Sequence, residues 1–118
     1  MRGRDIEKLE RMLHSIDLIV EYCKNETLNT FLSKNMLLDA CAMRLLALGE
    51  ESNRLSADCQ KRHPQIDWIS IYGLCNRVAH DYFRVDFEIL WEIIQNELIP
   101  LKSQFAEILV YEKNHSMQ

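Results

Sequence analysis

The stretch NMLLDACAMRLLALGEESNRLSAD, residues 35–58, decides the fold of this chain. Its apolar residues recur at helical spacing on two faces rather than one. One face carries Leu37, Cys41, Leu45 and Leu48, and the other carries Met36, Ala40, Met43 and Ala47. A helix that is apolar on two faces either lies centrally in its own bundle or also packs against a partner subunit. The sequence therefore predicts a long helix from about Asn35 to Asp58, with neighbours on more than one side.

A further helix is predicted before this one. Apolar residues recur in steps of three and four from Ile6 to Cys23, which is the narrow seam of a helix that packs against one neighbour. Asp5 directly precedes the seam and is predicted to be its N-cap.

Two more helices are predicted after the central one. The third begins near Pro64 or at an Asp67 cap and continues through Ala79. The fourth follows an Asp86 cap and extends to Ile108. An interior proline removes a backbone donor and clashes with the preceding turn, so Pro100 should kink or split this helix near Ile99. We therefore expect an all-α protein, an antiparallel bundle of four to five helices.

Composition narrows the class of protein. The 118 residues fit one domain, residues 1–118. The N-terminus is charged and no long apolar run is present, so the sequence predicts no signal peptide and no membrane span. A cytoplasmic location is therefore expected. The net charge of -4 argues against a protein that coats nucleic acid nonspecifically, although binding in a local cleft remains open. Four widely spaced cysteines are typical of reduced thiols used in packing.

Titratable and hydrogen-bonding residues gather in LCNRVAHDYF, residues 74–83, at the end of the third helix. Asn76 and Arg77 precede His80 by four and three residues, so the three side chains can project toward one region. A histidine and arginines such as Arg77 and Arg84 also suit a helix C-terminus, where they offset its partial negative charge. Spacing alone leaves a functional site and this structural role equally open.

The wider sequence resembles a known family. HPQIDWISIYGLCNRVAHDYFRVDFEILWEIIQNELIPLKSQF (63–105), preceded by AMRLLALGEESNRLS (42–56), is similar to the HepT-like branch of the HEPN superfamily, small helical ribonuclease toxins. The resemblance extends from about Asp5 to Ile108. The family motif is arginine, asparagine, three residues, histidine, one residue and tyrosine. Asn76, His80 and Tyr82 occupy three of its places, and Cys75 stands where the arginine belongs.

The resemblance implies a homodimer that cleaves RNA in a cleft between subunits, without metal or cofactor. His80 would transfer the proton, because its side chain titrates near neutral pH. Asn76 would orient His80 or the phosphate, and Arg77 and Arg84 are possible RNA contacts. A thiol at position 75 cannot supply the positive fork that binds phosphate oxygens, so weakened activity is expected.

The resemblance also implies a protein partner. In related toxins a minimal nucleotidyltransferase antitoxin transfers adenylate to the motif tyrosine, here Tyr82. The added bulk and negative charge beside His80 would block the cleft and repel RNA.

Two alternatives remain open. Cys75 makes an inactive HEPN module, one that dimerises and binds only its nucleotidyltransferase partner, a competing interpretation. Cys59 and His63 with Cys75 and His80 could also be drawn as a zinc site. That spacing is loose and His80 is better explained by the motif, so no metal is expected.

Overall fold

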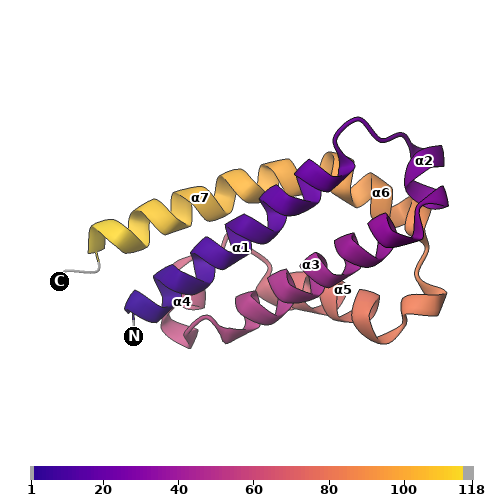
Figure 1. The fold of residues 1–118 in the computed structure, drawn as a ribbon. Coiled ribbons are helices and arrows are strands. Elements are labelled where there is room, and N and C mark those ends of the chain that lie inside the picture. The colour runs from indigo at the N-terminus through magenta and orange to yellow at the C-terminus, as the bar shows by residue number, and fades with distance from the viewer. Residues whose placement is uncertain (1, 116–118) are drawn as a thin grey trace.

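The computed structural model describes residues 2–115, apart from the side chains of residues 2, 3, 79 and 80. Over this range the chain is helical and contains no β-strand, which confirms the all-α prediction (Figure 1). The elements are α1 (Arg2–Cys23), α2 (Leu28–Ser33), α3 (Asn35–Arg54), α4 (Ala57–Arg62), α5 (Trp68–His80), the short 3-10 helix η1 (Tyr82–Arg84), α6 (Phe87–Asn96) and α7 (Leu98–His115).

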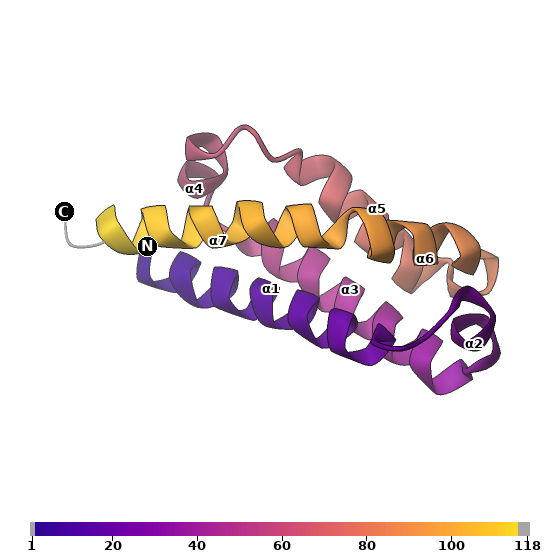
Figure 2. The same cartoon turned by 90° about the horizontal axis from the view of Figure 1, so that it is seen from above.

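The long helices run antiparallel in an elongated bundle of 50 × 27 × 21 Å. Helix α3 packs between α1 and α5, and α7 returns along α1 (Figures 1 and 2). The largest fully buried side chains include Leu9, Ile16, Leu45, Phe105 and Ile108. A long helix from residue 35 is therefore confirmed, and of the two alternatives for its apolar faces the structure shows the central position, with the seams of other long helices packed against it.

The predicted end of the central helix and the predicted first cap are both wrong. The helix ends at Arg54, and Ser56 begins the separate helix α4 by accepting a hydrogen bond from the Cys59 amide. Helix α1 already begins at Arg2, so Asp5 lies inside it. Instead of capping, the buried Asp5 carboxylate accepts hydrogen bonds from the Ser56 amide, at 2.9 Å, and hydroxyl, at 2.7 Å. Asp5 thereby fixes the turn between α3 and α4.

Helix α2 was not anticipated from the sequence. Thr27 and Thr30 form a reciprocal capping box at its start, and its buried Phe31 packs on Trp91 of α6 with ring centroids 4.9 Å apart. Six residues are too few for a hydrophobic period to be recognised, so only the cap could have signalled this helix.

The other two caps are confirmed. Asp67 accepts a hydrogen bond from the Ser70 amide at the start of α5, and Asp86 accepts from the Glu88 and Ile89 amides at the start of α6. The predicted split of the last helix near Ile99 is confirmed, since α6 ends at Asn96 and α7 begins at Leu98. Pro100 lies in the first turn of α7, where the missing amide hydrogen has no partner to lose.

None of the helices within residues 2–115 is both long enough and apolar enough to cross a membrane.

Candidate active site

The motif lies where α5 passes directly into η1. Asp81 ends α5, with its amide donating to the Arg77 carbonyl, and its own carbonyl accepts from the Arg84 amide at 2.8 Å. His80 is the last residue of α5. Its side chain lies outside the described residues, so its catalytic role stays a prediction. Its position in the chain places it at the partially negative end of the helix.

Cys75, the residue at the family arginine position, is buried between α5 and α3. Only 2% of it is exposed. A Cβ atom added to Gly49 of α3 would lie 2.4 Å from the Cys75 Cβ, so glycine at position 49 permits this close crossing of the two helices. Burial raises the pKa of the Cys75 thiol to about 12, and the group is therefore neutral near pH 7. It supplies no charge to a phosphate.

Arg77 and Arg84, the predicted RNA contacts, are both exposed and line one groove of about 290 Å³. The groove lies between α5, η1 and α6, and its lining also includes Asp81 and Asp86. The structure thus brings together two cations that are seven positions apart in the sequence. Asn76 is half-buried and is not part of this lining. It is Arg77, and not the motif asparagine, that shares a surface with Arg84.

Tyr82 lies on a different side of the motif end, against α3. Its hydroxyl donates a hydrogen bond to the carboxylate of Asp39. This bond, together with burial, raises the pKa of Tyr82 to about 12. The two side chains line a hollow of about 220 Å³ with Met43 and other apolar residues of α3, and with Val78 of α5. Neutral Tyr82 is therefore held as a donor beside a carboxylate.

Sequence reasoning missed Asp39 as a member of this site. The signal was a single carboxylate that interrupts the apolar run from Met36 to Leu48. Nothing in the sequence pairs it with a tyrosine 43 residues away, because that contact depends on how α3 packs against α5.

The alternative zinc set is not assembled as drawn. Among the described residues, the group of potential metal ligands is Cys59, His63 and Glu112, and it excludes Cys75, which packs against Gly49. Glu112 belongs to α7 and was not considered from the sequence.

Comparisons with known proteins identify the family. The family model described as ribonuclease HepT-like matches residues 12–108, most of the chain. This chain belongs to the HepT-like ribonuclease family. The resemblance to this family is therefore confirmed over residues 12–108. No solved structure gives a significant match.

Relatives of similar length support the same assignment. The chain is 30% identical to "Putative RNase TTE0752" of Caldanaerobacter subterraneus subsp. tengcongensis, over 89% of this chain and 94% of that protein. It is 28% identical to "Probable ribonuclease HepT" of Thermococcus cleftensis, over 92% of this chain and 98% of that protein. It is 29% identical to "Putative RNase MJ1380" of Methanocaldococcus jannaschii, over 88% and 96% respectively. The HepT-like domain thus accounts for nearly the full length of these relatives.

Proposed function

We propose that this chain is the toxin of a toxin-antitoxin system, a cytoplasmic endoribonuclease that cleaves RNA without metal in a cleft between two copies. The observation that carries the proposal is a groove lined by Arg77 and Arg84 where α5 ends, in the same segment of chain that carries the family motif and within the region that matches the family model. Exposed guanidinium groups attract the RNA backbone and fix it by charge-assisted hydrogen bonds to phosphate. An acidic chain can bind RNA in this way, because the positive charge is needed only locally.

In this mechanism His80 takes the proton from the attacking 2'-hydroxyl or gives one to the leaving oxygen. Asn76, one helical turn earlier, orients His80 or a phosphate oxygen. Charge that develops on the phosphate during the reaction needs positive donors aimed at it. The family arginine would supply them, and the buried neutral thiol of Cys75 does not. We therefore propose that the activity of this chain is attenuated.

The proposal of a second copy is supported by apolar surface around the motif. Met36 and Met43 of α3 are exposed, and Phe83 of η1 is 99% exposed. Large exposed apolar side chains are commonly covered by a partner, and a two-fold axis near them would bring two motifs together. Sedimentation should give a dimer at micromolar concentration. A monomer at that concentration would count decisively against a shared cleft.

We further propose that a nucleotidyltransferase antitoxin adenylates Tyr82. In that reaction the tyrosine oxygen attacks the α-phosphorus of the nucleoside triphosphate, a new oxygen–phosphorus bond forms and pyrophosphate leaves. Asp39 already accepts the hydrogen bond of this hydroxyl and is placed to take its proton. Modification should suppress cleavage by Cys75→Arg protein, and Tyr82→Phe should escape that suppression.

The deciding experiment compares RNA cleavage by the natural chain, by Cys75→Arg and by Cys75→Arg with His80→Ala. Restoring one charge-stabilising donor should raise the rate roughly a hundredfold to a thousandfold, and removing His80 should abolish the gain. The cavity of about 390 Å³ beside Cys75 gives the longer side chain room, and circular dichroism checks that each variant folds. If folded Cys75→Arg protein cleaves no RNA, or cleaves equally well without His80, the ribonuclease proposal fails.

A second candidate function is a module that has lost catalysis and only binds its nucleotidyltransferase. The burial and neutrality of Cys75 favour it. It predicts that Cys75→Arg protein remains inert while the unmodified chain still forms a complex with the nucleotidyltransferase.

A further inference from the structure

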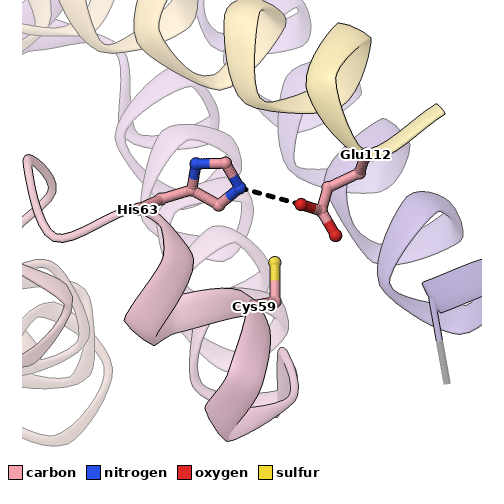
Figure 3. Close-up of side chains that lie close together, drawn as sticks. All are labelled: Cys59, His63 and Glu112. Atoms are coloured by element: carbon pink, nitrogen blue, oxygen red, sulfur yellow. Dashed lines mark hydrogen bonds and ion pairs between the residues drawn. The ribbon is translucent and has the colours of Figure 1, made fainter. Parts of the chain in front are cut away.

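A second cluster of reactive side chains lies where α4 meets α7. Cys59, His63 and Glu112 converge there, and their potential ligand atoms all lie within 4.8 Å of one another (Figure 3). All three residues are buried, and Glu112 is completely inaccessible. The Nε2 atom of His63 lies 2.9 Å from Oε2 of Glu112. A thiol, an imidazole and a carboxylate therefore face a common point inside the bundle.

Local structure explains why these groups converge. Cys59 lies within α4 and His63 is its C-cap, so the two residues are one helical turn apart and share a face. The Trp68 indole donates to the His63 carbonyl at 3.1 Å, and the His63 ring meets Tyr111 edge-on at 5.2 Å. The first contact holds the His63 backbone and the second packs its imidazole ring, in the absence of any ligand.

Arg62 holds the carboxylate of Glu112 in place. Its Nη2 atom donates to Oε1 and its Nε atom donates to Oε2, at 2.5 and 3.1 Å. A metal-bound carboxylate is usually oriented by such an outer hydrogen bond. The bond to Oε1 can persist while Oε2 gives up its bonds from Arg62 Nε and His63 Nε2 to an ion, with the imidazole proton then on Nδ1.

We propose that Cys59, His63 and Glu112 form a structural zinc site, contrary to the expectation from the sequence that no metal is bound. Zinc favours this mixture of sulfur, nitrogen and oxygen ligands. In a tetrahedral site the ligand atoms are roughly 3.4–3.6 Å apart, as follows from zinc–ligand bonds of about 2.0–2.3 Å. The separation of His63 Nε2 and Glu112 Oε2 is 2.9 Å and no two ligand atoms are more than 4.8 Å apart, so shifts of at most roughly 1 Å reach that geometry. A water molecule would take the fourth position of the tetrahedron.

The charges of the site are compatible with a buried dication. Burial and the negative charges of Glu112 and Asp5 raise the pKa of Cys59 to about 12, so the metal-free thiol keeps its proton. Zinc displaces that proton and binds the thiolate. The charges of Zn²⁺, the Cys59 thiolate, Glu112, Asp5 and Arg62 then sum to zero. A neutral cluster avoids the large desolvation penalty of an unpaired buried charge.

The location of the site gives it a structural role. Helix α4 lies at the end of the bundle where α1 begins and α7 ends, and η1 lies at the other end (Figures 1 and 2). Zinc would join α4 to α7, residues some 50 positions apart, and leave the motif free of metal. The proposed cleavage chemistry stays metal-independent, so the zinc proposal can be tested independently of it.

The first test is direct binding of Zn²⁺ to the full chain, without an affinity tag and in reducing buffer, by competition with a chromophoric chelator. We expect one zinc ion per chain and, at a hundredfold excess over the dissociation constant, a melting temperature raised by roughly 5–10 °C. Cys59→Ser should weaken binding by roughly a hundredfold or more, beyond the effect typical of outer-shell changes. The matched control is Cys41→Ser, because Cys41 is an equally buried thiol outside the cluster.

The second test does not depend on a variant folding. Co²⁺ substituted into the natural chain should give a thiolate-to-metal charge-transfer band, together with the visible spectrum of a tetrahedral site. Absence of stoichiometric binding, or of the thiolate band, overturns the proposal. So does binding that survives Cys59→Ser or is lost equally in Cys41→Ser, and the three side chains then form only a hydrogen-bonded clasp.

Discussion

The two ends of the bundle differ in the burial and pairing of their charged side chains. At the α4 end the carboxylates of Asp5 and Glu112 are buried, and every carboxylate oxygen accepts a hydrogen bond. At the motif end Arg77 and Arg84 are exposed, and their side chains make no ion pair with any other described side chain. The first arrangement pairs each buried carboxylate within the chain, whereas the second leaves two guanidinium groups without an ion-pair partner, in a groove that Asp81 and Asp86 also line.

This difference separates residues that maintain the fold from residues that could act on a substrate. A buried charge is tolerated only with a full set of partners, so removing one partner is expected to destabilise the folded state. An exposed cation contributes little to stability, and it can be replaced without unfolding the chain. The comparison predicts large losses of stability at the α4 end and losses of binding alone at the motif end.

The largest effect is expected for Glu112→Gln. The amide has the shape of the carboxylate but no charge, and only one of its two terminal atoms still accepts a hydrogen bond, so Arg62 and His63 can no longer both donate to it. We expect the free energy of unfolding to fall by about 2–4 kcal/mol, less than for a fully buried pair because the Arg62 side chain is 24% exposed. Urea unfolding measures the change. Glu107→Gln, at an exposed position of α7, is the control and should stay within about 0.5 kcal/mol of the natural chain.

Acid should remove the contribution that the ionised Glu112 side chain makes to the free energy of unfolding. Burial acts to raise the pKa of Glu112, but the hydrogen bonds from Arg62 and His63 outweigh it and lower the pKa overall. Since the folded state then binds this proton less readily than the unfolded chain, the contribution is fully present above about pH 4.3 and declines as pH falls through the folded pKa. The stability difference between the natural chain and Glu112→Gln should therefore shrink below about pH 4. A constant difference down to about pH 3 would contradict this assignment.

A smaller effect is expected at the contact between Tyr82 and Asp39. Asp39→Asn removes the negative charge beside the phenol, so the pKa of Tyr82 should fall from about 12 toward the ordinary value of about 10. Spectrophotometric titration measures it, with Tyr82→Phe identifying the component that belongs to this residue. Because Asp39 is exposed, the loss in unfolding free energy should be only about 0.5–1 kcal/mol. An unchanged pKa of Tyr82 would show that Asp39 does not stabilise the protonated phenol.

The sequence predicted the parts of this molecule that depend on local pattern. Apolar spacing located the long helices, and the caps at Asp67 and Asp86 were correct because each side chain bonds its own first turn. Asp5 was misassigned because its partner, Ser56, is 51 residues away. The same limit hid Asp39 beside Tyr82 and Glu112 beside His63. Cys75 was recognised as a departure from the motif, but only the packing against Gly49 reveals that its thiol is buried.

The smallest effect on stability, and the sharpest test of the comparison, is expected for Arg77→Gln combined with Arg84→Gln. Both side chains are exposed, so the free energy of unfolding should stay within about 0.5 kcal/mol of the natural value. If each guanidinium contacts one phosphate, the logarithmic salt dependence of binding to a short single-stranded RNA should weaken by about 1.4, or about 0.7 per contact. Arg54→Gln with Lys61→Gln removes the same charge from exposed positions at the α4 end and is the matched control. If this control weakens RNA binding and its salt dependence as much as the groove variant does, net charge rather than the groove governs binding. The groove at the motif end would then not be the RNA-binding site.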